Sequence, residues 1–380
     1  MSCNVCGSET IEELGQVGCK PISVTSEPNL CFLPAKVSYC QNCNHLQKVN
    51  SLTEISFIDS LYSNYSTYQV SEGNEQLVFL KEGWPKTRSY HVIEQCISLL
   101  PESGNLLDIG TGIGVVLKSA SQLLPKWNLF AFDLSDKYKK NILKIPGVVD
   151  FYSGSLQDLP DVKFNLIVLW HCLEHISKPL EFLSTIKDYL TEDGYLLIQV
   201  PDIHRTPFDL AVIDHCSHFT KSSLLKLFQS VGFSVAVDGE NWVHNCLTVL
   251  LKQDKGGSPN ICFSADNCPP ERYFDWLNKI VEKFEGSIHN RNYAIFGTGI
   301  SGIWLSSQLS KQPVFFIDED PKRTGNKISN VPIIRPQDVP KEIDIVMPFT
   351  EATGKNICLK MKKLYDNFNA GNFILSQPYT

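Results

Sequence analysis

An apolar run that ends in a glycine-rich turn constrains the fold of this chain more than any other feature. Residues 106–114 read LLDIGTGIG, and an amphipathic stretch follows from Val115 to Leu124. This order predicts a strand, a tight turn and a helix, in which glycine lets the backbone approach a ligand that a Cβ would exclude. A carboxylate that ends the next apolar run can accept hydrogen bonds from both ribose hydroxyls. The candidate nucleoside-binding residues are Asp108, Gly110, Gly112, Gly114 and Asp133.

Short apolar runs alternate with amphipathic stretches from Leu106 to Leu251. This alternation is typical of strands and crossover helices in a parallel sheet, so we expect a doubly wound α/β domain. The expected strands are Asn105 to Ile109, Leu129 to Asp133, Phe164 to Leu169, Tyr195 to Val200, Val235 to Gly239 and Leu247 to Lys252. A glycine-rich turn in such a domain could also hold a dinucleotide or no ligand, so the turn alone does not decide the cofactor.

Three further segments favour a methyl donor over a dinucleotide. Residues 153–160 (SGSLQDLP), 164–176 (FNLIVLWHCLEHI) and 190–198 (LTEDGYLLI) follow the turn in this order. They resemble the adenine-binding loop, the fourth strand with its following turn, and the fifth strand of class I methyltransferases. The resemblance implies S-adenosyl-L-methionine as cofactor, and it adds Leu134, Ser155, Leu156 and Trp170 to the donor site. A degenerate fold kept as a non-catalytic scaffold is the alternative, since fold does not guarantee activity.

Two CxxC pairs stand out in residues 1–50, a short, turn-rich segment with few apolar residues. They are Cys3 with Cys6 and Cys40 with Cys43, and 33 residues separate them. Each pair can present two thiolates to a tetrahedral Zn²⁺ ion, which would supply folding energy that so small a segment lacks. Four thiolates leave no open position on the metal, so the predicted role is structural. Cys19 and Cys31 could substitute as ligands, whereas a redox role is disfavoured because neither pair opens a helix after a strand.

Composition and charge exclude several classes of function. The chain of 380 residues has a net charge of −7 and lacks the clustered Lys and Arg that nucleic-acid binding needs. No apolar run reaches the ~18 residues of a membrane-spanning helix. Its start, Met1-Ser2-Cys3-Asn4, lacks the features of a secretory signal. We therefore expect a cytoplasmic protein with reduced cysteines that acts on a small molecule, as a monomer or homodimer.

The whole arrangement resembles the sugar C-methyltransferase family, whose members act on nucleotide-linked keto-deoxysugars. The shared order is a four-cysteine module, a class I core and a smaller C-terminal α/β unit. The family carries a Glu-His pair where this chain has Asp214 and His215. The resemblance implies that His215 removes the proton next to the sugar ketone, that Asp214 orients His215, and that His175 also lies in the active site. A metal site of His215, Cys216 and His218 is disfavoured, because no further ligand pair is near in sequence.

Two departures from the family bear on the substrate. The family has a tyrosine two positions before its glutamate, whereas this chain has Val212. Its tyrosine-rich segment after the cysteine module is approximated by Tyr62, Tyr65 and Tyr68, of which Tyr65 is the candidate site residue. These tyrosines close over the donor or substrate, or alternatively pack between domains.

A second α/β unit is expected near the C-terminus. Residues 293–302 (YAIFGTGISG) form a strand and a GxGxxG turn, and Asp318 ends the next strand. The expected strands are Tyr293 to Phe296, Val314 to Asp318 and Ile343 to Met347. The spacing would suit a dinucleotide. Because the unit is short, however, substrate binding or interdomain structure is favoured over NAD.

The sequence thus predicts an α/β protein with a class I methyltransferase core, a small zinc module and a second Rossmann-like domain. The expected segments are 1–50 (zinc module), 51–100 (helical connection and tyrosine-rich lid), 101–254 (methyltransferase core), 255–288 (linker and helix) and 289–380 (C-terminal domain). C-methylation of a nucleotide-linked sugar is the leading hypothesis. The alternatives are an O- or N-methyltransferase acting on another small intermediate, a scaffold, and an NAD-dependent enzyme.

Overall fold

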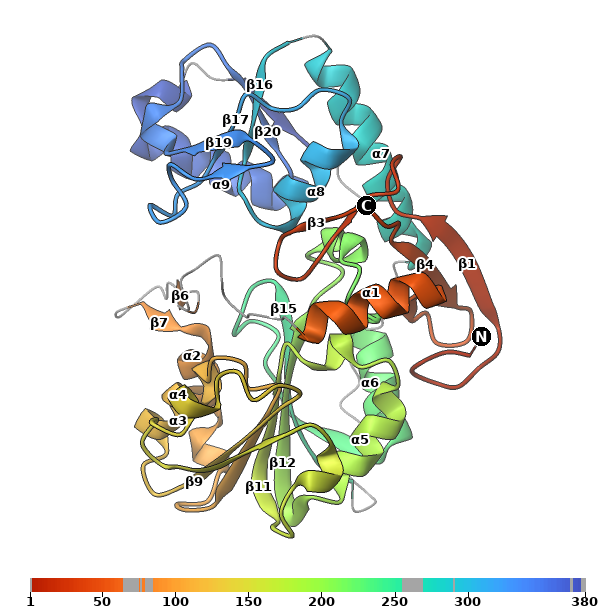
Figure 1. Cartoon of the computed structure of the whole chain (residues 1–380), viewed down its shortest axis with the longest axis vertical. Helices are drawn as coiled ribbons and strands as arrows, with labels where there is room; N and C mark the ends of the chain where they lie inside the picture. Colours follow the sequence, from red (N-terminus) through yellow and green to blue (C-terminus); the bar gives the residue numbers. More distant parts are fainter. Residues whose placement is uncertain are drawn as a thin grey trace.

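The computed structural model in Figure 1 describes residues 2–63, 75, 77–78, 85–254, 269–289, 291–369 and 372–376. Two α/β units lie at opposite ends of the molecule, and the N-terminal strands lie beside the junction between them. The expected linker, Lys255 to Asn267, falls outside the described residues. None of the described helices is both long and apolar enough to cross a bilayer.

The middle sheet has the strand order β10-β9-β8-β11-β12-β15-β14. Its strands are β8 (Asn105–Ile109), β9 (Asn128–Asp133), β10 (Val148–Ser153), β11 (Phe164–Trp170), β12 (Leu190–Pro201), β14 (Phe233–Asp238) and β15 (Cys246–Gln253). Neighbours pair in parallel except at β15, which runs antiparallel to both β12 and β14. The strand order reverses between β8 and β11, and ligands of open α/β sheets bind beyond the carboxyl ends of the strands at such a reversal.

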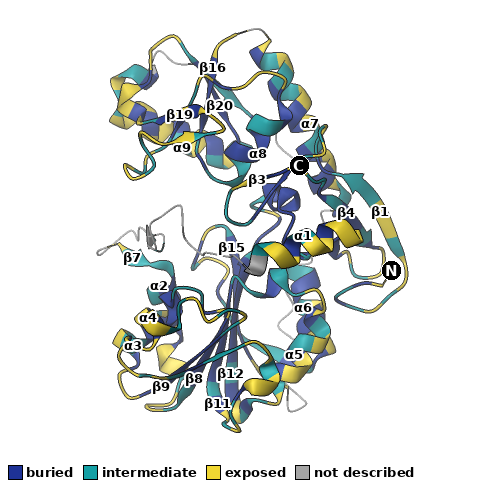
Figure 2. Ribbon diagram, viewed as in Figure 1, coloured by how far each residue is buried: buried dark blue, intermediate teal, exposed yellow. Residues whose placement is uncertain are grey.

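Successive residues of the central strands pack against helices on opposite faces, which explains their almost continuous apolar sequence. Leu106 faces α2 (Arg88–Cys96) and α3 (Val115–Leu123), whereas Leu107 faces α5 (Pro179–Lys187) and α6 (Lys221–Ser230). Figure 2 shows these strands mostly buried between the two helical layers. The α/β core expected from the sequence is therefore confirmed.

The C-terminal sheet has the order β18-β19-β17-β16-β20-β21, with only β18 antiparallel to its neighbour. Its strands are β16 (Tyr293–Phe296), β17 (Phe315–Ile317), β18 (Lys327–Ile328), β19 (Val331–Ile334), β20 (Asp344–Met347) and β21 (Asn372–Leu375). Helices α8 (Ile300–Gln308) and α9 (Glu351–Leu364) accompany it. All three strands expected for this region lie in one sheet.

The N-terminal sheet includes a strand from the middle of the chain. Its order is β1-β4-β5-β13, where β13 (Ser217–His218) pairs antiparallel with β5 (Leu46–Lys48). The other N-terminal elements are β1 (Ile11–Gln16), β2 (Ser23–Val24), β3 (Leu30–Cys31), β4 (Lys36–Cys40) and α1 (Leu52–Ser63). A short hairpin, β6 (Leu77–Val78) with β7 (Lys86–Thr87), precedes α2. The N-terminal module is thus joined to the middle α/β domain through one sheet.

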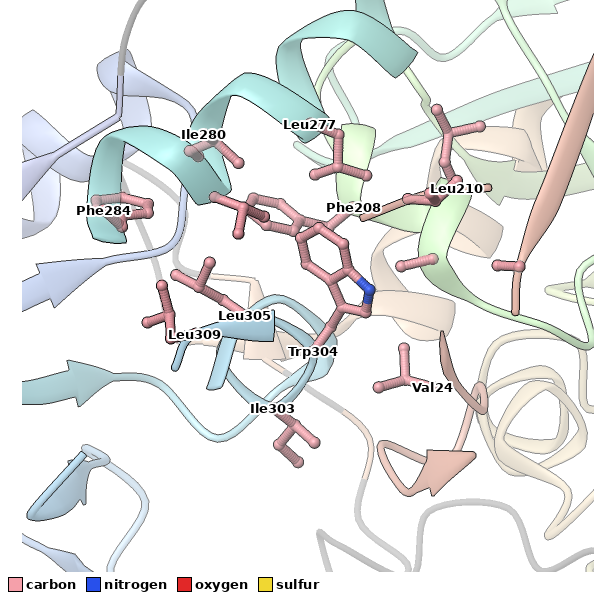
Figure 3. Close-up of a cluster of buried hydrophobic side chains, with 14 of the residues drawn as sticks. Val24, Phe208, Leu210, Leu277, Ile280, Phe284, Ile303, Trp304, Leu305 and Leu309 are labelled. Atoms are coloured by element: carbon pink, nitrogen blue, oxygen red, sulfur yellow. The ribbon is translucent and has the colours of Figure 1, made fainter. Parts of the chain in front are cut away.

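A single apolar cluster joins the three regions. Figure 3 shows Trp304 of α8 packed near Phe208, Val24 and Leu277, which come from three different parts of the chain. Leu277 lies on α7 (Glu271–Ile288), and Phe208 lies on the short helix η5 (Pro207–Ala211). Trp304 is fully buried. The segment that follows η5 is therefore anchored by this junction.

Candidate active site

The glycine-rich turn between β8 and α3 adopts the backbone that its sequence predicts. Gly110, Gly112 and Gly114 have φ values of 76°, 49° and 77°, a region that L side chains rarely adopt. A Cβ added to Gly110 would lie 3.0 Å from the sulfur of Cys172, so this residue of the segment that follows β11 packs directly against the turn. A Cβ at Gly114 would lie 2.5 Å from Ile142 Cδ1, so that glycine also permits close packing within the domain.

Asp133 ends β9 beside this turn. Its Oδ2 accepts a hydrogen bond from the Gly112 N–H at 2.8 Å, and its Oδ1 accepts one from the Ser135 N–H at 3.2 Å. Burial raises the pKa of Asp133. The next residue, Leu134, is 66% exposed and offers an apolar surface at the edge of the turn. Both residues lie where the sequence predicts contact with a nucleoside.

Asp108 lies beneath the turn with half of its carboxylate unpaired. Oδ2 accepts a hydrogen bond from the Thr111 hydroxyl at 2.7 Å, whereas Oδ1 is buried and has no hydrogen-bond donor among the described residues. Burial raises the pKa of Asp108 to about 7. A buried acceptor without a partner is unfavourable, and a cationic ligand group would satisfy it. The ammonium group of S-adenosylmethionine fits this requirement.

The remaining donor-site candidates lie at the same edge of the sheet. Ser153 pairs with Asp133, and Ser155 caps the short helix η3 (Leu156–Asp158) that follows. Ser155 is exposed and Leu156 half-buried, so both can meet a ligand. Trp170, in contrast, is 6% exposed and packs in the cluster that contains α2 and α3. Its side chain belongs mainly to the core.

Segment 171–175 connects the glycine turn to a group of histidines. His171 has a φ of 48° and lies 3.1 Å from a carboxylate oxygen of Glu174 through Nδ1. Burial alone would raise the pKa of Glu174, but the His171 hydrogen bond and nearby histidines lower it. Neither His171 nor Glu174 was predicted as a site residue. A glutamate within the apolar run of 164–176 was the available signal, because buried carboxylates are rare without a partner.

His215 belongs to a buried group in which two histidines contact the same carboxylate. Its Nδ1 lies 2.7 Å from Asp209 Oδ1, and Nδ1 of His218 lies 2.6 Å from Asp209 Oδ2. Burial alone would lower the pKa of His215, but Asp209 raises it to about 9. Burial lowers that of His218 to about 4, with Lys48 adding to the effect. These nitrogen–oxygen distances of 2.6 and 2.7 Å are typical of hydrogen bonds. They are shorter than the distance between two ligand atoms on one metal ion.

Nδ1 of His215 is bonded to Asp209 rather than to Asp214, the residue that was expected to orient it. The Asp214 carboxylate turns toward the N-terminal module, where it accepts hydrogen bonds from the Ser26 N–H at 2.8 Å and the Ser26 hydroxyl at 2.5 Å. Asp209, on η5, takes the orienting position instead. The backbone carbonyl of Asp214 accepts a hydrogen bond from Nδ1 of His175 at 3.0 Å.

His175 contacts the predicted base. The rings of His175 and His215 are 4.6 Å apart and meet edge to face. Atoms of His175, His215 and Glu174 all lie within 4.8 Å of one another. Burial, together with His215, lowers the pKa of His175. The structure thus brings together His175 and His215 as predicted, and it adds Asp209 and Glu174.

The tyrosines expected over the site cannot be placed. Tyr65 and Tyr68 lie outside the described residues, as does the side chain of Tyr62. Val212 is fully buried and forms a parallel bridge with Val24. A substrate contact through this side chain is therefore absent, in keeping with its departure from the family.

The comparisons with known proteins agree with the geometry of the middle domain. Residues 86–236 match a family model described as a methyltransferase domain. This part of the chain is thus similar to a methyltransferase domain, a fold whose expected cofactor is S-adenosylmethionine. One curated relative, a release factor glutamine methyltransferase of Enterococcus faecalis, is 28% identical over 90 residues. That match covers 22% of this chain and 32% of the relative, about a third of the relative's length.

Solved structures of methyltransferases are among the structures to which the chain is similar. The mitomycin 7-O-methyltransferase is 14% identical, with a TM-score of 0.38 over 44% of this chain and 53% of that one. An N,N-8-amino-8-demethyl-D-riboflavin dimethyltransferase of Streptomyces davawensis is 18% identical, with a TM-score of 0.34 over 39% of this chain and 49% of that one.

The four predicted metal-ligating cysteines converge beside the methyltransferase domain. Sulfur atoms of Cys3, Cys6, Cys40 and Cys43 all lie within 4.8 Å of one another. Each CxxC pair is followed by a left-handed residue, Gly7 or Asn44, whose N–H donates to the carbonyl of the first cysteine of its pair. Cys19 instead donates to the Gln308 carbonyl, and Cys31 packs in a separate apolar cluster. The thiolate set therefore fits one tetrahedral Zn²⁺ ion without them.

The C-terminal glycine turn is arranged differently from the turn of the methyltransferase domain. Asp318 Oδ2 accepts hydrogen bonds from Thr298 N–H at 3.1 Å, from the Thr298 hydroxyl, and from Arg323 Nη1 at 3.3 Å. Its Oδ1 accepts one from the Asp320 N–H at 2.9 Å. Among the described residues, Asp133 is bonded to backbone N–H groups alone, whereas Asp318 also holds an arginine and a threonine hydroxyl, and these side chains occupy the position of a ribose and disfavour NAD at this turn.

Proposed function

We propose that the protein transfers a methyl group from S-adenosylmethionine to a carbon atom next to a ketone in a nucleotide-linked sugar. The donor is held by the turn at 110–114 with Asp108 and Asp133. His215 is the base, Asp209 orients it, and His175 lies beside it. The protein is then a cytoplasmic enzyme of carbohydrate or secondary-metabolite synthesis, and Zn²⁺ bound by the four cysteines stabilises its N-terminal module.

The observation that carries this proposal is the short connection between the donor turn and the base. Cys172 packs against Gly110, and His175, three residues later, contacts His215. Both contacts lie at the carboxyl edge of the sheet, where β8 and β11 end. A donor on the turn and an acceptor beside His215 would share one site, and alignment supplies most of the catalysis of methyl transfer.

The side chains have distinct tasks in this proposal. S-adenosylmethionine, when bound, supplies an electrophilic methyl group. His215 removes a proton from the acceptor through Nε2, because Nδ1 is bonded to Asp209. Asp209 fixes the ring orientation and stabilises the imidazolium that forms. The half-buried His175 adds a polar group that can face the acceptor oxygen.

An oxygen or nitrogen acceptor on another small intermediate is the second candidate. The burial of Val212 favours it, because the tyrosine hydroxyl of the sugar C-methyltransferases is missing here. A base such as His215 would serve a hydroxyl acceptor equally well. The two candidates therefore share the donor site and differ only in the acceptor atom.

The first experiment measures donor binding by calorimetry, with zinc quantified in the same sample. We expect S-adenosylmethionine and S-adenosylhomocysteine to bind the wild type and not Asp133→Ala. The matched control is Asp136→Ala, which changes an exposed carboxylate nearby and should leave binding unchanged. Absence of binding by a folded protein would support the scaffold alternative instead.

The second experiment identifies the acceptor atom. Nucleotide-linked ketosugars are incubated with the enzyme in D₂O, and exchange of the proton next to the ketone is followed by NMR. Exchange by the wild type that is lost in His215→Asn supports C-methylation. Methylation of an oxygen or nitrogen without exchange would replace it with the second candidate.

A further inference from the structure

The N-terminal module holds the segment that carries His215 from two sides. On one side, β5 pairs with β13, and the Lys48 N–H donates to the Cys216 carbonyl at 3.1 Å. On the other side, the Val24 carbonyl accepts a hydrogen bond from the Ile213 N–H at 2.8 Å. Together with the two hydrogen bonds from Ser26, these contacts span most of residues 209–218.

Lys48 adds a contact that its position in a strand does not require. Its side chain is buried, with the residue only 7% exposed, and its ammonium donates to the carbonyl of Leu210. Burial lowers the pKa of Lys48 to about 7, while the facing carboxylates act against this change. The charged or titratable groups around it are Asp209, Asp214, Cys216, Glu54 and His218. A buried ammonium is costly to desolvate, so burial here calls for a function.

We propose that Lys48 is a positioning residue for His215, through which the N-terminal module holds Asp209 where it can orient the base. The role of His215 as a base rests on the proposed function, whereas the contacts that position it do not. Leu210 directly follows Asp209, and each Asp209 oxygen is bonded to a different histidine. A shift of the Leu210 carbonyl would therefore misalign the carboxylate with both rings.

The test compares Lys48→Met with Lys36→Met in the full chain. Lys36 lies on β4 of the same sheet, is half-buried, and contacts no residue of 209–218 through its side chain among the interactions described. Hydrogen exchange of the Ile213 amide reports directly on the docking of the segment. We expect at least a tenfold faster exchange in Lys48→Met and no change in Lys36→Met.

A second readout distinguishes positioning from general destabilisation. Because the Lys48 charge lowers the pKa of His218, that pKa should rise in Lys48→Met, as followed by NMR of ¹⁵N-labelled histidine. Lys48→Gln keeps a hydrogen-bond donor without the charge, and it serves as the second variant should Lys48→Met not fold. The pKa of His218 should rise in this variant too.

Wild-type values for both the exchange rate and the His218 pKa in the folded variants would overturn the inference. Neither measurement requires a donor or an acceptor. A protein that failed to bind S-adenosylmethionine would therefore disprove the proposed function alone. Once an acceptor is known, Lys48→Met should lower kcat at least tenfold with the KM for the donor unchanged.

Discussion

At the residue scale, the charge of His215 depends on a carboxylate six positions away along the chain. The sequence predicts the adjacent Asp214 as the partner of His215, and the structure offers Asp209 in its place. Only the turn of η5 decides between them, because it brings Asp209 back to His215 while Ser26 holds Asp214. The glycine turn, in contrast, could be predicted correctly, since its conformation depends on neighbouring residues.

The Asp209 contact predicts a distinct pH dependence of catalysis. With the pKa of His215 raised to about 9, the neutral imidazole that can accept a proton increases as the pH rises toward that value. The rate of methyl transfer should therefore increase from neutral pH to about pH 9. In Asp209→Asn the midpoint should move to lower pH, and the limiting rate should fall about 100-fold. Asp214→Asn is the comparison, and an equal effect in both variants would contradict the assignment.

Asp108 predicts opposite effects on stability and on binding. Burial raises the pKa of its carboxyl group to about 7, whereas the ordinary pKa of an aspartate is near 4. As the pH rises from about 4 through 7, the free energy of unfolding therefore falls, because the folded protein must hold a buried charge. Asp108→Asn should remove this loss and raise the ligand-free melting temperature at pH 8. The same change should weaken S-adenosylmethionine binding at least about tenfold. Calorimetry and thermal unfolding of one sample measure both, and a variant that binds normally would exclude Asp108 from the donor site.

At the element scale, strands with continuous apolar sequences could be predicted, whereas β5 and β13 could not. β8, β11 and β12 have nearly continuous apolar sequences, because both of their faces are buried. β5 has three residues and β13 has two. They pair with each other although most of the middle domain lies between them in the sequence. Strands of two or three residues are too short to show a hydrophobic periodicity. For this reason the sequence alone predicts an independent module for residues 1–50.

The cysteine cluster predicts one zinc ion per chain. Cys40→Ser should abolish stoichiometric zinc and lower the melting temperature, because the surrounding segment is too small to fold on its own core. Cys19→Ser should retain both the metal and the melting temperature, since Cys19 contacts Gln308 instead. Metal analysis and calorimetry measure these outcomes. Full zinc occupancy in Cys40→Ser would show that this cysteine is not a ligand.

At the scale of the whole molecule, the regions are joined by packing around Trp304 rather than by the chain connection alone. Val24, Phe208 and Leu277 meet it from three different regions (Figure 3). The sequence indicates two α/β units, but it contains no local signal for their contact. Because apolar residues from all three regions are buried at this junction, the junction stabilises the active-site segment.

Truncation of Trp304 should test this junction. Trp304→Ala should destabilise the protein by about 3–5 kcal/mol, because it leaves a large cavity in a fully buried site. The matched control, Leu359→Ala, changes a residue of the same domain that is 68% exposed, and it should have little effect. Denaturant unfolding measures both variants. Equal stability of Trp304→Ala and the wild type would mean that the regions are held together elsewhere.

The pairing of β5 with β13 has a consequence during synthesis of the chain. A ribosome releases β5 long before it releases residues 217–218, so the outer edge of the N-terminal sheet has no neighbour while most of the methyltransferase domain is being made. Unpaired strand edges readily associate with other chains. Nascent chains that stop before residue 217 should therefore depend on chaperones more strongly than those that continue past residue 218.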